Sequence, residues 1–255
     1  MKALLAIIKY GIRQSWESAA YKYTIFIQPI LFSALFYLIN RLSKNDMTSL
    51  AIILKSGMIS LWSSVCFSSL CDLQRERETR TLGSLLGTPT SLFKIILGKV
   101  IPNTIIGLIS FFISSITLML LSEKLVFDCT FLEIIFCILI LLSSYITTAI
   151  CIIPIFNIFD NTRLLINCIE YPIFMITGMA FPVSYLPQFM QWLGQLLPMT
   201  WGIKIVNSLL IEKKSIYQVH EIKIYVLMIT AYVIMALLLF RKVEYEIRIK
   251  ANINI

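Results

Sequence analysis

The sequence predicts an all-α membrane protein, a single transmembrane domain over residues 1–255 built from six transmembrane helices. Composition is the first reason: 58% of the residues are hydrophobic and 14% are charged, whereas soluble domains carry about a quarter charged residues. The second reason is that the apolar residues gather in long runs. A helix rises about 1.5 Å per residue, so about 20 apolar residues cross a bilayer. The 255 residues therefore suit one membrane bundle without a separate soluble domain.

Six apolar runs are candidates for these spans. They cover residues 23–39, 50–70, 101–121, 132–153, 164–181 and 224–240. The first and last are short but are bounded by charged residues. Pro172 interrupts the fifth, which a membrane bundle tolerates when neighbouring groups satisfy the freed backbone atoms.

The distribution of Lys and Arg predicts the orientation. With the N-terminus inside, the cytoplasmic segments hold 14 of these residues and the outer segments hold 7. Because cytoplasmic loops carry the excess of basic residues, we expect a multi-pass protein of the cell inner (plasma) membrane with both termini in the cytoplasm. The basic residues stand at the ends of apolar runs, a pattern that argues against nucleic-acid binding despite the net charge of +8.

Residues 2–20 predict a helix that lies in the inner membrane interface. Its apolar face carries Leu4, Leu5, Ile8, Ile12 and Trp16. Lys2, Lys9, Arg13 and Glu17 lie beside that face, as in interfacial helices whose basic side meets lipid headgroups. A tail without this structure is the alternative.

The cytoplasmic connection at 72–90 has more charge than topology requires. It opens with the run Asp72-Leu-Gln-Arg-Glu-Arg-Glu-Thr-Arg80, continues with an apolar helical stretch, and is broken at Gly87-Thr-Pro89. Such a surface suits docking on a soluble partner. A solvated loop without a partner remains the alternative.

The outer segment at 181–222 is too apolar for a free loop, and each apolar piece is too short to span. A helical stripe is formed by Leu186, Phe189, Met190, Leu193 and Leu197. Pro182, Pro187 and Pro198 divide it. These features predict one or two short re-entrant helices in or on the outer leaflet.

Residues typical of catalytic or metal sites are sparse. Most of the six cysteines fall inside apolar runs and none forms a C-x-x-C pair, so we interpret them as small buried hydrophobes. His220 is the single histidine; it precedes Glu221, but the second histidine of H-E-x-x-H is missing. An intramembrane enzyme is therefore disfavoured, and no catalytic, cofactor or metal residue is expected.

At two segments the sequence resembles the ABC type-2 transporter permeases, which include polysaccharide, drug and bacteriocin exporters. The family's cytoplasmic pattern is close to R-E-R-E-x-G-T-L-E-x-L-L-x-T-P, and here it reads Arg75-Glu-Arg-Glu-Thr-Arg-Thr-Leu-Gly-Ser-Leu-Leu-Gly-Thr-Pro89. The family's F-P-x-S-x-L-P is Phe181-Pro-Val-Ser-Tyr-Leu-Pro187 here, followed by Pro198-Met-Thr200. Arg80 replaces the family glycine, and Gly83 replaces the glutamate after Thr-Leu.

The resemblance implies a permease that works as a homodimer or heterodimer in lipid, each copy bound to an ABC ATPase subunit that carries the ATP and Mg²⁺. The 72–90 segment would be the coupling helix, with Arg75, Glu76, Glu78, Leu82, Leu85 and Leu86 as contacts to the ATPase. An outer lid would include Phe181, Pro182, Leu186, Pro187 and Pro198. The chain lacks the G-x-x-x-x-G-K-[ST] loop, so hydrolysis would come from the partner.

Spans two and five supply candidates for the translocation path, which these spans border in the family. Asn167, Glu170 and Thr177 fall on roughly one face of span five, and a membrane carboxylate should avoid lipid. Ser60 and Ser64 belong to an i, i+4 serine stripe in span two.

Each of these candidates has a structural alternative. Glu170 could line the path or make an internal hydrogen bond, and helix packing is the favoured role of the serines. Lys55 lies too far from Glu170 in depth to be its expected ionic partner.

The chain has 12% aromatic residues, and its predicted spans hold few charges. This composition favours export of an amphipathic or hydrophobic cargo, such as a drug, an antimicrobial peptide or a lipid-linked molecule. The rival function is a membrane subunit that recruits a soluble partner through 72–90 without transporting anything.

Overall fold

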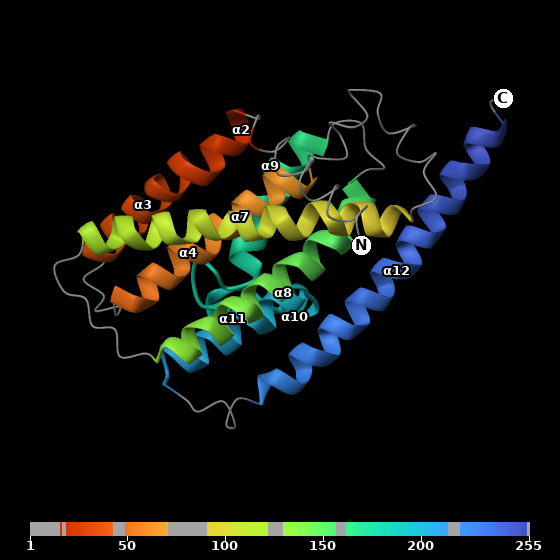
Figure 1. Ribbon diagram of the computed structural model, residues 1–255. Coiled ribbons are helices and arrows are strands. Elements are labelled where there is room, and N and C mark those ends of the chain that lie inside the picture. The colour runs from red at the N-terminus through yellow and green to blue at the C-terminus, as the bar shows by residue number, and fades with distance from the viewer. Residues whose placement is uncertain are drawn as a thin grey trace.

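The structure is a computed structural model that describes residues 16, 19–42, 49–70, 91–121, 130–156, 162–213 and 220–253. Over these residues it is a bundle of helices without strands, which confirms the predicted all-α class (Figure 1). The elements in chain order are α2 (Ala19–Lys22), η1 (Tyr23–Ile27), α3 (Gln28–Leu42), α4 (Ser49–Val65), η2 (Cys66–Leu70), α7 (Leu92–Leu121), α8 (Phe131–Phe156), α9 (Thr162–Ile176), η3 (Val183–Tyr185), α10 (Gln188–Leu196), α11 (Pro198–Leu210) and α12 (Glu221–Ile253). Two of these segments, η1 and η2, are π-helical.

Five helices in the described residues are long and apolar enough to cross a membrane. They run over Tyr23–Leu42, Leu50–Ser69, Leu92–Leu121, Leu132–Ile155 and Glu221–Lys242. The third begins nine residues before the predicted start at 101. Lys94 and Lys99 lower the hydropathy of its first turns, but helix ends depend on backbone hydrogen bonding as well as on hydropathy.

The predicted fifth span, 164–181, is shorter in the structure. Helix α9 has 15 residues and ends at Ile176, about 22 Å of rise against a hydrocarbon core of about 30 Å. It ends because Gly178 adopts φ +84°, a left-handed conformation that terminates helices and that glycine adopts without a Cβ penalty.

Helix α4 lies at the centre of the bundle. Its Trp62 is completely buried and meets Tyr145 of α8 edge to face, with 5.5 Å between the ring centroids. The Tyr145 hydroxyl donates to the Met58 carbonyl of α4 at 3.3 Å. Aromatic pairs in this geometry add to the free energy of burial, so this ring pair stabilises the contact between α4 and α8.

Helices α4 and α7 pack closely through small residues. A Cβ atom at Gly107 would overlap the Oγ of Ser64, and Ser114 donates a hydrogen bond to Ser56 at 2.9 Å. Small side chains let two backbones approach closely, which is how membrane helices gain contact without a hydrophobic driving force.

The segment at 181–222, which the sequence predicts to be on the outer side, forms short helices in its described part. With 9 and 13 residues, α10 and α11 are too short to cross a bilayer. Helix α11 packs against α8 and α12, whereas α10 exposes Phe189, Trp192 and Leu196. A Cβ at Gly194 would overlap the Ile176 carbonyl oxygen, so α10 lies directly against the end of α9.

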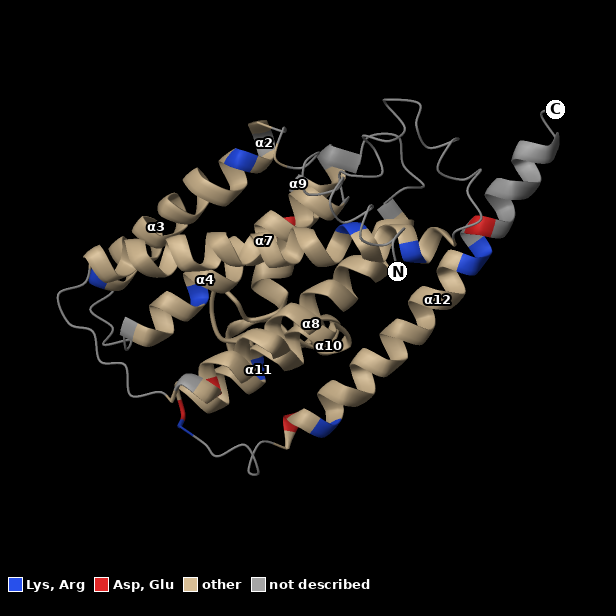
Figure 2. Cartoon of the chain, viewed as in Figure 1, with Lys and Arg blue, Asp and Glu red and all other residues tan. Residues whose placement is uncertain are grey.

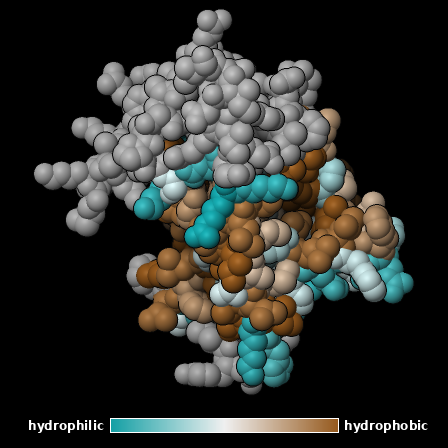
Figure 3. All heavy atoms as spheres, turned by 90° about the vertical axis from the view of Figure 1, so that its right-hand side faces the viewer, coloured by the Kyte–Doolittle hydropathy of each residue, from teal (hydrophilic) through white to brown (hydrophobic). Residues whose placement is uncertain are grey.

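The outer surface of the described bundle is largely apolar. Charged residues gather near the helix ends, with long uncharged stretches between them (Figure 2). On the face shown in Figure 3, hydrophobic side chains dominate between hydrophilic groups at either end. On α12, for example, the side chains of Leu227, Ile234 and Leu238 are each more than half exposed. In water such a surface would be unfavourable, but it suits contact with lipid.

Candidate functional site

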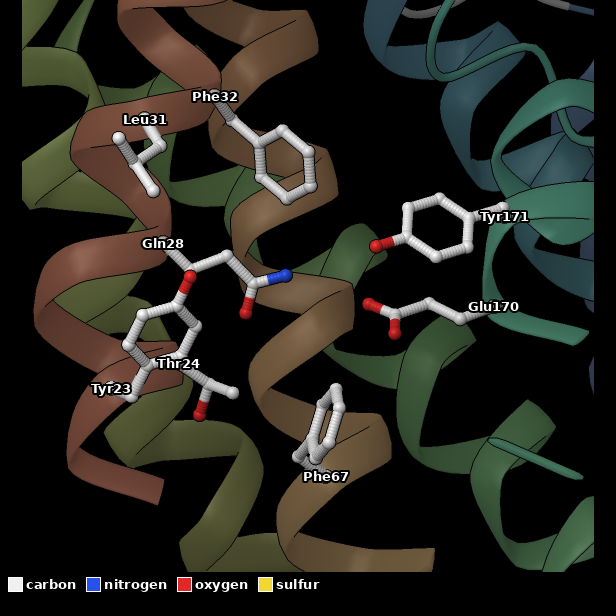
Figure 4. Close-up of a pocket in the computed structure, with 8 residues that line it drawn as sticks. All are labelled: Tyr23, Thr24, Gln28, Leu31, Phe32, Phe67, Glu170 and Tyr171. Atoms are coloured by element: carbon white, nitrogen blue, oxygen red, sulfur yellow. The ribbon is translucent and has the colours of Figure 1, made fainter. Parts of the chain in front are cut away.

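A cavity with a buried carboxylate opens beside the first helices. It has a volume of about 440 Å³ and lies between η1 and α3 on one side and η2 and α9 on the other. Its lining consists of Tyr23, Thr24, Gln28, Leu31, Phe32, Phe67, Glu170 and Tyr171. Gln28 approaches from one side, Glu170 and Tyr171 approach from the other, and Phe32 and Phe67 flank the space between them (Figure 4). We call this the Glu170 cavity.

Glu170 is held in place by span two. Its side chain is only 2% exposed, and its Oε1 accepts a hydrogen bond from the Ser63 hydroxyl. A buried carboxylate is costly unless it is paired or hydrogen-bonded. The hydrogen bond from Ser63 connects the end of α4 that lies next to η2 with α9. It fixes the Glu170 carboxylate at the wall of the cavity.

Two π-helical segments contribute to this cavity. Tyr23 and Thr24 belong to η1, and Phe67 belongs to η2. A π-turn shifts the helical register, so side chains that would otherwise follow the α-helical face are reoriented, and such turns are frequent at functional sites. The Thr24 hydroxyl donates to the Tyr21 carbonyl at 2.8 Å, which keeps it within its own helix.

The structure does not gather all predicted path residues at one place. Thr177 is buried in the turn after α9, where its hydroxyl donates to the Ile173 carbonyl at 2.6 Å. The side chain of Asn167 lies outside the described residues. Ser60 and Ser64 are fully buried, and their hydroxyls donate to carbonyls of their own helix. A role of these residues in the path stays a prediction.

A second cavity lies toward the other end of the same helices. It measures about 570 Å³ and is lined by α3, α4 and the turn after α9, with Lys55, Phe181, Pro182 and Tyr185 among its residues. We call this the Lys55 cavity. Helix α3 contributes Gln28 to the Glu170 cavity and Asn40 to this one. Gln28 and Asn40 are 12 residues apart, which is about 18 Å along a helix. Glu170 and Lys55 therefore line different cavities.

The predicted lid residues occupy the junctions of the outer segment. Phe181 and Pro182 line the Lys55 cavity. Leu186 follows η3, the exposed Pro187 immediately precedes α10, and the buried Pro198 is the first residue of α11. A closing movement of this segment stays a prediction.

Lys204 of α11 is a cation of this outer segment. It lies over the Trp201 ring, with 4.3 Å from Nζ to the ring centroid. Burial lowers the pKa of Lys204, and the nearby Glu221 carboxylate raises it. The ring and Glu221 both favour the charged form of this lysine.

The predicted coupling residues Arg75, Glu76, Glu78, Leu82, Leu85 and Leu86 lie outside the described residues, as does most of the predicted interfacial helix at 2–20. Before this segment, the last described residue is Leu70, three residues after Phe67 of the Glu170 cavity. In sequence, the 72–90 segment thus begins almost at the cavity wall.

In the described part of the chain, the His, Cys, Asp and Glu residues form no group of three that could hold a metal ion. Of the described cysteines, Cys66, Cys137 and Cys151 are buried and Cys168 is exposed, and none of these four forms a disulfide.

Sequence reasoning missed several residues of the Glu170 cavity. Ser63 is one position away from the predicted serine stripe. Gln28, Phe67 and Tyr171 lie within apolar runs and were not singled out. Gln28 carried a usable signal, because a polar amide in an apolar span should face a protein interior or a cavity. Phe67 and Tyr171 carried none, since aromatic residues are common on every face of a membrane helix.

Comparison with known proteins adds one result. The sequence model of the family described as ABC-2 type transporter matches residues 2–211. A search of curated proteins gave no match. The matched range includes the Glu170 cavity, the 72–90 segment and the outer helices, and it ends just before α12.

Proposed function

Because the chain belongs to the ABC-2 type transporter family and is an integral membrane permease subunit of an ABC transporter, we propose that it moves an amphipathic or hydrophobic cargo outward. The cargo classes that we favour are a drug, an antimicrobial peptide or a lipid-linked molecule. We infer that the protein lies in the cell inner (plasma) membrane, with both of its termini in the cytoplasm.

The observation that carries this proposal is the Glu170 cavity. It has room for a small organic molecule, and its walls are mainly apolar and aromatic with a few polar groups, which is typical of ligand sites. The cavity lies between span one, span two and α9, and spans two and five border the path in the family.

Energy for transport would come from a partner. We infer an ABC ATPase subunit that binds ATP and Mg²⁺ and docks on the 72–90 segment through Glu76 and Glu78. The connection from Phe67 to that segment is only a few residues long, so a movement of the docked helix would reach the cavity wall directly. A second permease chain, identical or different, would complete the transporter.

The test begins with gentle purification of the tagged chain and identification of what accompanies it. We expect a stoichiometric ATPase subunit, whose loss follows reversal of Glu76 and Glu78 to Lys, because both carboxylates would face the partner. Glu212→Lys is the matched control, since Glu212 is exposed in the outer segment, and it should retain the ATPase.

Transport is tested with inverted membrane vesicles that contain both subunits. ATP-dependent uptake of a lipophilic dye into inverted vesicles would support export. An intact complex that hydrolyses ATP but moves no cargo from a diverse panel would instead favour the recruiting subunit. Purification without any ATPase would contradict the proposed partner.

A further inference from the structure

The Glu170 cavity has a definite sign of charge. Of the described residues that line it, Glu170 is the only one with an acidic or basic side chain of the carboxylate, ammonium or guanidinium type. The Lys55 cavity, at the other end of α3, has a basic residue instead. The two cavities therefore differ in the charge that they offer a ligand, and only the first favours a cation.

The acceptor atoms around the Glu170 cavity are not fully used. Ser63 donates to Oε1 of Glu170, and the described residues supply no second donor to the carboxylate. The Oε1 atom of Gln28 is buried without a hydrogen-bond partner among the described residues. An unpaired buried acceptor costs free energy. A ligand that donates hydrogen bonds would remove that cost at Gln28, and the Glu170 carboxylate at the same cavity could accept from it as well.

Aromatic rings form the remaining walls. Phe32 and Tyr171 both meet Phe174 edge to face, with centroid distances of 6.1 Å and 5.9 Å, so one buried ring holds two of the walls in place. Phe67 closes the cavity from the η2 side (Figure 4). The faces of aromatic rings attract cations, and rings beside a carboxylate recognise organic ammonium groups.

We propose that the Glu170 cavity binds an organic cation, a molecule with an ammonium group on an apolar or aromatic body. The ammonium group lies between Glu170 and Gln28, and the apolar body lies against Phe32, Phe67 and Tyr171. This inference rests on the proposed function, because it assigns the chemical class of the exported cargo.

A bare inorganic cation fits this cavity less well. Hard cations such as Ca²⁺ take about 6–8 oxygen ligands, whereas the described lining offers one carboxylate among mainly apolar and aromatic side chains. An anion is disfavoured by Glu170 itself. The combination of one charge, donor-seeking oxygens and ring faces matches an organic ammonium best.

The test is equilibrium binding to the permease–ATPase complex in lipid nanodiscs, without nucleotide. The probe is rhodamine 6G, a cationic aromatic dye, with empty nanodiscs to measure its partition into lipid. Dodecylammonium and dodecanol are the competitors, since they share a chain and differ in charge. We expect saturable dye binding and displacement by dodecylammonium at a concentration at least about tenfold lower than by dodecanol.

Three variants locate the site. Glu170→Gln keeps the shape of the side chain and should weaken dye binding about tenfold or more, as expected when a charged partner is replaced by a neutral one. Gln28→Lys leaves the Glu170–Ser63 bond intact and should weaken dye binding by repulsion, so it decides the matter if Glu170→Gln fails to fold. Glu133→Gln is the control. The Glu133 carboxylate accepts from the Thr130 amide at 3.0 Å, outside the cavity, and its loss should leave binding unchanged.

The outcomes separate this inference from the proposed function. Equal dye affinity in wild type, Glu170→Gln and Gln28→Lys would overturn the cation site and leave Glu170 with a structural role. The same conclusion follows if ammonium and alcohol compete equally, or if no saturable binding is found. None of these results would contradict the proposed function, because ATP-dependent transport of an uncharged cargo in inverted vesicles would still support it. Failure of the proposed function would show differently, as tight cation binding without ATP-dependent transport of any cargo.

Discussion

Gly107 of α7 lies against Ser64 of α4 so closely that a Cβ at position 107 would overlap the serine Oγ, while remaining 3.7 Å from the serine Cβ. The added Cβ would therefore overlap the hydroxyl oxygen of Ser64 and not its Cβ. The same hydroxyl donates to the Leu61 carbonyl at 3.0 Å, which fixes its direction. At this contact the packing of α4 and α7 therefore depends on the absence of a side chain at position 107.

Gly107→Ala should lower the free energy of unfolding by about 1–3 kcal/mol, the usual cost of overpacking a core. Adding Ser64→Ala should restore most of that loss, because the two Cβ atoms would then be at ordinary contact distance. Thermal denaturation of the detergent-solubilised single and double variants measures this coupling. Strictly additive losses would contradict the predicted contact.

Ser63 and Glu170 should show coupled stabilities. Ser63→Ala removes the described donor to the Glu170 side chain and should cost about 1–3 kcal/mol, since a buried acceptor is left unsatisfied. Ser60→Ala is the control, because its hydroxyl donates only to the Ser56 carbonyl at 2.7 Å, and it should cost much less. A double-mutant cycle with Glu170→Gln, monitored by thermal denaturation, should give a coupling energy of at least about 0.5 kcal/mol.

Trp62→Ala should be among the most damaging core substitutions. The ring is fully buried and packed on Tyr145, and removal of a buried aromatic ring costs about 3–5 kcal/mol. Trp192 is 69% exposed on α10, so Trp192→Ala serves as the matched control with a small effect. The measurement is the fraction of monodisperse protein that survives heating, read by size-exclusion chromatography. Similar losses for both tryptophans would refute the assignment of the core.

Gly178→Ala should destabilise the turn between α9 and the outer helices. The residue has φ +84°, and an added Cβ would lie 2.8 Å from Cγ2 of Val183. The left-handed conformation alone costs an L-residue about 1–2 kcal/mol, and the contact adds to it. Combining the change with Val183→Ala should recover only the contact part. Limited proteolysis of the 176–188 region, together with thermal denaturation, reports the effect, and full recovery in the double variant would argue against backbone strain.

Hydropathy was sufficient for five of the spans because each apolar run is favourable in lipid whatever its neighbours are. It placed helices over 50–70, 132–153 and 224–240 to within a few residues at most ends. It was less successful for the predicted span at 164–181, where Gly178 ends the helix early. A run of apolar residues does not reveal a left-handed turn, because the backbone conformation of a glycine depends on what surrounds it.

The sequence by itself determined that this chain is a helical membrane protein, which charged residues bound its spans, and that a carboxylate at position 170 must be shielded from lipid. These properties follow from the cost of moving each side chain out of water, and that cost belongs to the residue. Only the tertiary structure decided that Ser63 is the donor to Glu170 and that Gln28, Phe67 and Tyr171 share its cavity. Those relations join helices far apart in the chain, and the crossing of helices and the π-turns of η1 and η2 set them.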